Sequence, residues 1–435
     1  MKRVLVITYY WPPSGGSGVQ RWVKFARYLP AEGWQPVIYT PSNPELTAVD
    51  ETLAAEVPDG VEVIRRPIRE PYALYRRVMG KDSSTDMKTL VTPISSTGRK
   101  GFKQRLSLFV RGNCFVPDPR VGWVRPSVRF LSKYLKEHPV DVIVTTGPPQ
   151  SVHLIGQRLA RKTGLPWIPD FRDPWTKMYY LRHLGMTRGT WKRLYRMEQS
   201  VLDEATKVLT VTPVVQEEYQ ARTKTPVAMI TNGFDPADFS APEPRDGYFN
   251  LTHTGLLASD GNPLVLWKVL GGLAASDPDF RAALRIRLAG KTDREVLEAI
   301  ASAGLDGQLV NAGYLDHAAA VREQQQAEIL LLPLRNDPEY FRILPGKLFE
   351  YLAARRPILG IGQTDGAMAR VLSDAAAGEM FAWDDEAGIR DFVERAWKRF
   401  RNGGIPPTGG EIDRYTRQHL THELATLLDS VIFPA

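Results

Sequence analysis

"MKRVLVITYYWPPSGGSGVQRW", residues 1–22, is the stretch that decides the fold. A basic, apolar run reaches Thr8, and two prolines and three glycines follow it before a helix-like stretch begins. The apolar residues of that stretch recur at helical spacing: Val19, Trp22, Val23, Ala26 and Leu29. A glycine loop between a strand and a helix is where many α/β proteins hold a phosphate. The stretch therefore predicts the first strand, loop and helix of such a domain, and not a signal peptide, because no small-residue cleavage site follows.

The same alternation of strand and helix continues along the chain. Further strand-like runs in the first half lie at 35–40, 61–66, 140–146, 166–171 and 207–212. The pattern restarts near residue 249, with runs at 248–257, 284–290, 309–315, 328–334 and 356–362. Short β-branched strands alternating with helices predict an α/β fold with a parallel sheet covered on both sides. The chain is thus expected to form two doubly wound domains.

Length and composition set the predicted boundaries. A chain of 435 residues is too long for a single core, and the polar segment 232–248 is rich in Pro, Asp and Gly. We predict an N-terminal domain over 1–235, a C-terminal domain over 236–410 and a C-terminal helix over 411–435 that packs back across both. A long basic and loop-rich insertion, 75–128, interrupts the first domain.

Charge and cysteine content narrow the class of protein. The single cysteine, Cys114, cannot form an internal disulfide, which suits a cytoplasmic protein. No apolar run approaches the roughly 20 residues that span a bilayer. The formal charge of +7 is compatible with nucleic acid, anionic lipid or phosphorylated substrates. No nucleic-acid-binding module is recognisable, so no nucleic-acid partner is expected.

Three short motifs resemble known sites but lack an essential part. Gly16-Ser17-Gly18 could begin a dinucleotide fingerprint, but Arg21 stands where the third glycine belongs. Gly290-Lys291-Thr292 resembles the end of a P-loop, but Arg285 replaces its first glycine inside a predicted strand. Asp277-Pro278-Asp279 is typical of a turn, and the seven histidines show no metal-ligand spacing. No metal and no cofactor are therefore expected.

The most informative motif is "RILPGKLFEYLAARRPILGIG", residues 342–362. Its loop, Leu344-Pro345-Gly346, is expected to open a helix whose free amides face a ligand. Lys347 opposes the helix dipole there unless an anion lies between them. Glu350, one turn later, can accept hydrogen bonds from two sugar hydroxyls. The motif predicts a clamp for a nucleoside diphosphate, and a surface helix with solvated charges is the alternative.

At this motif the chain resembles a known family. "PGKLFEYLAARRPIL" is similar to the donor-site signature of the family 4 GT-B glycosyltransferases, which use nucleotide sugars and retain the anomeric configuration. The resemblance extends to "TNGFDPADF" (231–239), "LTHTGLL" (251–257) and "AGYLDHAAAVREQQQAEILLLPL" (312–334). "DFRDPW" (170–175) and "VPDPRVGW" (116–123) resemble a bacterial branch tied to cell-surface polysaccharides. The resemblance implies two Rossmann-like domains facing a central cleft and transfer of a sugar to an acceptor hydroxyl without a bound metal.

The resemblance also implies donor-binding residues. Glu350 would bind the ribose, and Lys347 with the amides around Gly346 would bind the diphosphate. The family's Glu-x7-Glu pattern has Arg342 at its first position here, and Arg342 would share the phosphate role. The further implied donor contacts are Gly16, Ser17, Gly18, Gly255, Leu344, Pro345 and Tyr314, of which Tyr314 would line the base pocket.

Three residues of the first domain are candidates for the chemistry. Asp173, with Arg172, would lie near the transferred sugar and organise the acceptor; a helix cap or an ion pair with Arg172 is the alternative for Asp173. His153 is expected at a helix start near the cleft.

Two basic segments of the chain indicate the kind of acceptor and where the protein is located. Residues 101–112 and 178–196 mix Arg and Lys with aromatic and apolar residues, which suits an anionic membrane surface or, alternatively, a solvated basic face. We expect a glycan or lipid-linked acceptor and peripheral contact with the inner face of the cell membrane. Two other functions stay open: a GT-B sugar-nucleotide epimerase, whose His and acidic set is not found here, and a non-catalytic partner subunit, because Arg342 replaces a glutamate.

Overall fold

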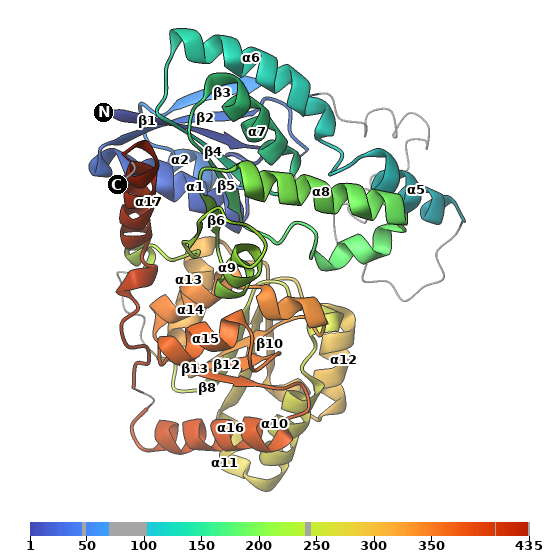
Figure 1. Cartoon of the computed structure of the whole chain (residues 1–435). Coiled ribbons are helices and arrows are strands. Elements are labelled where there is room, and N and C mark those ends of the chain that lie inside the picture. Colours follow the sequence, from blue (N-terminus) through green and yellow to red (C-terminus); the bar gives the residue numbers. More distant parts are fainter. Residues whose placement is uncertain (46–48, 69–101, 240–244, 405, 434–435) are drawn as a thin grey trace. The chain divides into compact units, whose positions relative to one another are not determined.

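The computed structural model describes residues 1–45, 49–68, 102–239, 245–404 and 406–433. The chain forms two compact units. Unit 1 contains 1–231 and 417–435, and unit 2 contains 232–416. Each unit is a parallel sheet with helices on both faces (Figure 1).

Unit 1 is built on a parallel sheet of seven strands in the order β3-β2-β1-β4-β5-β6-β7. Its strands are β1 (Lys2–Thr8), β2 (Trp34–Pro41), β3 (Glu62–Arg66), β4 (Val142–Gly147), β5 (Trp167–Phe171), β6 (Val208–Thr210) and β7 (Val227–Met229). Sequence order reverses between β1 and β4, which pair in register from Val4 with Val142. Ligands of open α/β sheets bind beyond the carboxyl ends of the strands at such a reversal.

Helices cover both faces of this sheet. They are α1 (Ser17–Tyr28), α2 (Thr52–Ala55), α5 (Phe102–Cys114), α6 (Val124–Glu137), α7 (Ser151–Thr163), α8 (Arg188–Glu204), α9 (Pro213–Gln220) and α17 (Arg417–Ile432), with the short helices η1 (Leu29–Glu32), η2 (Val121–Trp123) and η3 (Tyr179–Leu184). Alternate residues of β1 pack into two different hydrophobic clusters, because successive side chains of a strand point to opposite faces of the sheet. Leu5 and Ile7 pack with α6 and α7, whereas Val4 and Val6 pack with α1 and α17.

The C-terminal helix returns to unit 1. In Figure 1, α17 lies beside α1, although the two are separated by nearly the whole sequence. Leu420, Leu424 and Leu428 are buried among side chains of β1, β4 and α1. Residues 411–416, which the sequence grouped with this helix, belong to unit 2.

Unit 2 repeats the plan with six parallel strands in the order β10-β9-β8-β11-β12-β13. The strands are β8 (Phe249–Thr254), β9 (Leu284–Ala289), β10 (Leu309–Gly313), β11 (Ile329–Pro333), β12 (Ile358–Ile361) and β13 (Gly378–Phe381). The helices are α10 (Leu264–Ser276), α11 (Pro278–Ala283), α12 (Arg294–Ser302), α13 (His317–Gln326), α14 (Gly346–Ala354), α15 (Ala367–Asp374) and α16 (Glu386–Arg401), with η4 (Pro236–Phe239), η5 (Ser259–Gly261), η6 (Asp306–Gln308), η7 (Pro338–Arg342) and η8 (Asp413–Tyr415). Here the sequence order reverses between β8 and β11.

The structure corrects one expectation of local structure. The insertion 75–128 was expected to be rich in loops; residues 75–101 lie outside the described residues, but 102–128 contain α5, η2 and the start of α6. Leu108 is buried in the unit 1 core, and a Cβ at Gly112 would stand 2.9 Å from the Leu184 carbonyl oxygen. This part of the insertion is therefore a helix that packs closely against the end of η3.

Candidate functional site

The glycine loop lies at the carboxyl end of β1, beside the point where strand order reverses. Gly16 is the residue before α1 and has φ of +113°, a backbone conformation that residues with a side chain rarely adopt. Its carbonyl accepts hydrogen bonds from the amides of Val19 and Gln20 and so starts the helix. Ser17 and Gly18 are the first two residues of α1. The loop thus presents the first turn of α1 at the edge where ligands bind in this class of sheet.

Arg172 is held against that first turn. The carboxyl end of β5 places it next to β4, where its Nε donates to the Gly147 carbonyl (3.1 Å) and its Nη2 to the Pro148 carbonyl (2.9 Å). Its Nη1 lies 1.2 Å from the position that a Cβ at Gly18 would take. A cation at a helix N-terminus opposes the helix dipole, so this position suits an anion shared by the guanidinium and the amides.

His153 lies in the first turn of α7, as the sequence predicts, but its ring is completely buried. Its Nδ1 is 2.9 Å from Thr145 Oγ1, and its ring packs on Phe171 with centroids 4.5 Å apart. Burial, with a smaller contribution from the Arg172 charge, lowers the pKa of His153 to about 3. The imidazole is therefore neutral at physiological pH and is enclosed by the protein.

Asp173 follows Arg172 and is half-buried. Burial raises the pKa of its carboxyl, and the neighbouring Arg172 charge opposes that rise. Among the described residues its carboxylate has no hydrogen-bond partner, so the alternative of a helix cap does not describe it. An incompletely solvated carboxylate without a partner at this edge is suited to accept a hydrogen bond from a substrate hydroxyl.

Two residues near this edge carry no assignment from the sequence. Tyr180, in η3, has its pKa raised by burial and then by the charge of Asp173, which places it within electrostatic range of that carboxylate. Asp118 accepts hydrogen bonds from the Ser151 amide (2.7 Å) and hydroxyl (2.8 Å), and so fixes the start of α7. "VPDPRVGW" signalled Asp118 as part of a motif without indicating this role, and no sequence pattern singled out Tyr180.

In unit 2 three of the predicted donor residues, Gly255, Lys347 and Glu350, lie together at the carboxyl end of β8. Gly255 follows β8 with φ of +114°, and a Cβ there would lie 3.5 Å from Cε of Lys347. Lys347 Nζ donates to Glu350 Oε2 over 2.9 Å. Both side chains are partly exposed, 33% for Lys347 and 16% for Glu350, so both remain accessible to a ligand.

Gln324 is the residue of this site that the sequence analysis missed. It is fully buried, and its Nε2 donates to Glu350 Oε2 (2.8 Å) and to Thr254 Oγ1 (3.0 Å). Glu350 is therefore held from two sides, by Lys347 and by Gln324. The run of three glutamines in α13 gave no reason to choose the first of them.

The loop before α14 has the predicted form. Leu344 is buried, Pro345 precedes the helix, and Gly346 and Lys347 are its first residues. No side chain among the described residues caps this N-terminus, and the Leu348 amide bonds to the Pro345 carbonyl. The amides of Gly346 and Lys347 are thus not used by a side-chain cap among the described residues, and the Lys347 ammonium extends from the same first turn.

Two further predicted donor residues lie in different surroundings. Arg342 is buried at the end of η7, paired with Glu339 and placed with its guanidinium carbon 4.0 Å from the Phe341 ring centroid. Tyr314, which follows the edge strand β10, is 92% exposed. The structure brings neither into the group formed by Gly255, Lys347 and Glu350, and the donor roles of Arg342 and Tyr314 stay predictions.

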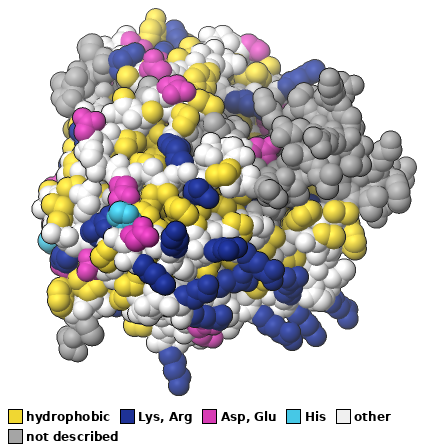
Figure 2. Space-filling model, turned by 90° about the horizontal axis from the view of Figure 1, so that it is seen from above, with side chains coloured by type: hydrophobic (Ala, Val, Ile, Leu, Met, Phe, Trp, Pro, Cys, Tyr) yellow, Lys and Arg dark blue, Asp and Glu magenta, His cyan; other side chains and the backbone are white. Residues whose placement is uncertain are grey.

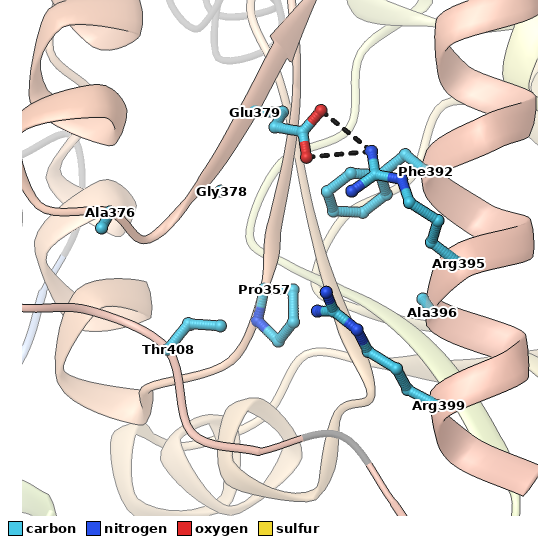
Figure 3. Close-up of a pocket in the computed structure, with 9 residues that line it drawn as sticks. All are labelled: Pro357, Ala376, Gly378, Glu379, Phe392, Arg395, Ala396, Arg399 and Thr408. Atoms are coloured by element: carbon cyan, nitrogen blue, oxygen red, sulfur yellow. Dashed lines mark hydrogen bonds and ion pairs between the residues drawn. The ribbon is translucent and has the colours of Figure 1, made fainter. Parts of the chain in front are cut away.

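A pocket of about 260 Å³ lies at the amino-terminal end of the strands of the unit 2 sheet (Figure 3). Pro357 and Gly378, at the amino ends of β12 and β13, line it together with Arg395 and Arg399 of α16. Arg395 is already bound to Glu379 through Nη2 (3.0 Å). Because the candidate donor residues lie at carboxyl ends of strands, this pocket is separate from them.

Two motifs that the sequence analysis rejected as binding sites, residues 290–292 and 277–279, have ordinary structural roles. Arg285 lies inside β9, so Gly290-Lys291-Thr292 follows a strand and cannot form a P-loop with it. Asp277 caps α11 by accepting from the amides of Asp279 and Phe280. Within the described ranges, no three His, Cys, Asp or Glu side chains are placed to bind a metal ion. No helix in those ranges has the length and apolarity needed to cross a membrane.

Comparison with solved structures shows the fold. The chain is similar to a glycosyltransferase from Rickettsia africae ESF-5 (12% identity, TM-score 0.61, covering 100% of this chain and 99% of that one). It is also similar to the lipopolysaccharide outer core galactosyltransferase WaaB in its apo form (12%, 0.56, 100% and 99%). A putative UDP-N-acetylglucosamine 2-epimerase from Listeria monocytogenes matches as well (9%, 0.52, 99% and 96%). The predicted GT-B fold class, with two doubly wound domains, is confirmed.

Comparison by sequence shows the family. No curated protein matches the chain in sequence. The family model described as "Glycosyl transferase 4-like domain" matches residues 15–233, just over half of the 435 residues. The match begins within the glycine loop and ends beside the junction of the two units. The chain therefore belongs to the glycosyl transferase 4-like family.

Proposed function

We propose that this protein is a retaining glycosyltransferase that moves a hexose from a nucleotide sugar to an acceptor hydroxyl. The observation that carries the proposal is the group at the carboxyl end of β8. Gly255, Lys347 and Glu350 meet there beside the N-terminus of α14, which no side chain of the described residues caps. A cation and free amides suit a diphosphate, and an accessible carboxylate suits ribose hydroxyls. Family membership supports the same activity.

In the proposed reaction the leaving group is a nucleoside diphosphate. Negative charge develops on its phosphate oxygens as the bond to the sugar breaks, and preorganised donors stabilise that charge. Lys347 and the amides of Gly346 and Lys347 supply them from unit 2. For unit 1, we propose that the amides of the first turn of α1 and Arg172 contact the donor diphosphate. No metal ion enters this scheme, so chelation with EDTA should leave the rate unchanged.

Asp173 is proposed to orient the acceptor hydroxyl. Its half-buried carboxylate has no hydrogen-bond partner among the described residues, so it can accept one from an incoming hydroxyl. His153 is proposed to support the site by packing beneath it, because a buried imidazole with a pKa of about 3 does not carry protons at neutral pH.

The proposed acceptor is a lipid-linked or cell-surface polysaccharide precursor at an anionic membrane. Exposed Arg188, Lys192, Arg193 and Arg196 line α8, and Phe109 (45%) and Val110 (40%) are exposed on α5. The Asn113 side chain accepts from the Thr187 amide (2.9 Å) and so joins the two helices. Figure 2 shows Lys and Arg side chains in a band beside hydrophobic ones. Charge next to exposed apolar side chains suits the surface of an anionic bilayer.

Two measurements test these proposals. Incubation with UDP- and GDP-sugars should release the free diphosphate, slowly by hydrolysis and faster with an acceptor. Conversion of the donor into an isomeric sugar nucleotide would instead indicate an epimerase, and no turnover with intact nucleotide binding would indicate a non-catalytic subunit. Flotation with phosphatidylglycerol vesicles should show salt-sensitive binding that the variant R193E/R196E loses and the variant K398E/R399E, on α16, keeps.

A further inference from the structure

The residue in the third glycine position, Arg21, has a completely buried side chain. It lies on α1, one turn beyond the glycine loop. Its Nη1 donates to the Thr231 carbonyl (2.6 Å) and its Nη2 to the Ile230 carbonyl (2.9 Å). A single guanidinium thus binds two consecutive backbone carbonyls that follow β7.

These two carbonyls belong to the segment in which the chain leaves unit 1. β7 ends at Met229, unit 1 ends at Thr231, and unit 2 begins at Asn232. The returning connection passes from Thr416 to Arg417. We call residues 230–231 the exit segment. Arg21 is therefore a direct side-chain link between the helix that carries the glycine loop and the exit segment.

A second set of contacts joins Arg21 to Arg172. Nη2 of Arg21 is 3.4 Å from Asp170 Oδ1, and Asp170 Oδ2 accepts from Trp22 Nε1 (2.8 Å). Asp170 is in β5, two residues before Arg172, whose guanidinium lies against Gly18. The chain of contacts runs from the exit segment through Arg21 and Asp170 to the first turn of α1.

Stability alone does not account for this arrangement. Replacing a buried ion pair with well-packed apolar residues is often neutral or stabilising, because the charges must be desolvated. Nε of Arg21 and Oγ1 of Thr231 are buried without a hydrogen-bond partner among the described residues. What the guanidinium specifically provides is a rigid fork of donors, which fixes the direction of two carbonyls at once.

We propose that Arg21 is a positioning residue that couples the order of the glycine loop to the order of the exit segment. Its importance for sugar transfer rests on the proposed function, in which the first turn of α1 contacts the donor diphosphate. A disturbance of the exit segment reaches Gly16–Gly18 through Arg21, and a disturbance of the loop reaches the exit segment by the same contacts.

The test is amide hydrogen exchange on the full chain, compared among wild type, Arg21→Lys and R21M/D170N. Lysine keeps the charge but lacks the fork. The double variant removes both charges, while the side-chain amide introduced in place of Asp170 can still accept from Trp22 Nε1 through its oxygen. In both variants exchange should accelerate at residues 17–20 and at 230–232 together, and stay at the wild-type rate in β2 and α6. Arg27→Lys, an exposed change on the same helix, should match wild type.

Activity and binding supply the second readout. In Arg21→Lys, kcat should fall on the order of 10- to 100-fold, because small misplacements of a binding group have such effects. Binding of UDP or GDP to unit 2 should still slow exchange at 346–350 in that variant. Exchange that accelerates uniformly through unit 1, or at only one of the two segments, would overturn the coupling. A wild-type protein that transfers no sugar would overturn the proposed function alone, because the exchange pattern without ligand still decides the role of Arg21.

Discussion

The Arg172 guanidinium occupies the space that a side chain at Gly18 would need, with Nη1 1.2 Å from the ideal Cβ position. Gly18 is helical and has no positive φ, so the requirement for glycine is one of space. Two backbone carbonyls, of Gly147 and Pro148, keep Arg172 in this place. The glycine loop and the loop after β5 are thus fitted to each other.

Gly18→Ala should separate activity from stability. The methyl group meets the end of a long side chain, which can move away at little cost to folding, so the midpoint of thermal unfolding should change by no more than a few degrees. Arg172 can no longer lie at the α1 N-terminus, and kcat should fall on the order of 100-fold. Steady-state kinetics and calorimetry measure the two effects.

The matched control for this change is Gly189→Ala. Gly189 lies in the first turn of α8, where a Cβ would meet Thr187 Oγ1 at 3.9 Å and no other atom of the described residues within 4 Å. Its activity should equal that of wild type. Wild-type kcat in Gly18→Ala would mean that the position of Arg172 has no part in the reaction.

Lys347→Met should weaken nucleotide binding. Removing a charge-assisted hydrogen bond to a phosphate costs about 2 kcal/mol, which corresponds to a rise in Kd of about 30-fold. Titration calorimetry with UDP and GDP measures the change. The control is Lys268→Met on α10, which removes an exposed ion pair with Glu386 and should bind as wild type does.

Glu350→Gln should weaken binding of the ribose without weakening binding of the phosphates. The amide keeps the size of the side chain but loses the charge that Lys347 and Gln324 both contact. UDP and GDP should bind more weakly, whereas inorganic pyrophosphate should bind as well as or better than to wild type, since a negative charge near the phosphates is gone. Equal losses for all three probes would contradict the assignment of Glu350 to the ribose.

The sequence predicted the framework of this fold because the signal there is local. Strands such as β1 and β11 contain continuous apolar runs, VLVI and ILLL, as expected for strands buried on both faces. The short strands β7 and β13 were missed. Gly378, the first residue of β13, is there because a Cβ would stand 2.1 Å from the Ile358 carbonyl oxygen, a requirement visible only in three dimensions.

In the candidate site, too, residues in local motifs were predicted, whereas residues that act through contacts distant in sequence were not. Gly255, Lys347 and Glu350 stand in recognisable motifs and meet in the structure. Gln324 has no motif and contributes through a contact with Glu350 across 26 positions of sequence. Arg21 was noted only as a missing glycine, because nothing local indicates that its side chain reaches residues 230 and 231.

Stability should depend on pH through His153. Its pKa is about 3 in the folded protein against the ordinary 6.5, so between these values the unfolded chain binds a proton that the folded chain does not. The contribution of His153 to the free energy of unfolding is therefore complete above about pH 6.5 and falls as the pH decreases, by about 2 kcal/mol between pH 7 and pH 5. Burial also lowers the pKa of His253, which acts in the same direction.

Urea unfolding at both pH values tests this contribution. His153→Gln, which can still bond to Thr145, should lose about 2 kcal/mol less than wild type on acidification. His138→Gln, an exposed change after α6, should follow wild type. If His153→Gln and wild type lose stability in parallel, the imidazole titrates normally and is not enclosed as the structure has it.

Asp173→Asn should reduce transfer more than donor hydrolysis. The carboxylate is proposed to orient the acceptor hydroxyl, so kcat for transfer should fall about 100-fold, within the range for positioned acid–base groups. Water does not need the same orientation, and slow hydrolysis of the nucleotide sugar should change less.

Because burial raises the pKa of Asp173, wild-type transfer should decline on acidification at a higher pH than an ordinary aspartate would give, and Asp173→Asn should lack that decline. Asp59→Asn, an exposed change in the same unit, is the control for both measurements. Equal losses of transfer and hydrolysis in Asp173→Asn would contradict a contact with the acceptor. They would indicate that Asp173 contacts the donor, since only a donor contact is common to both reactions.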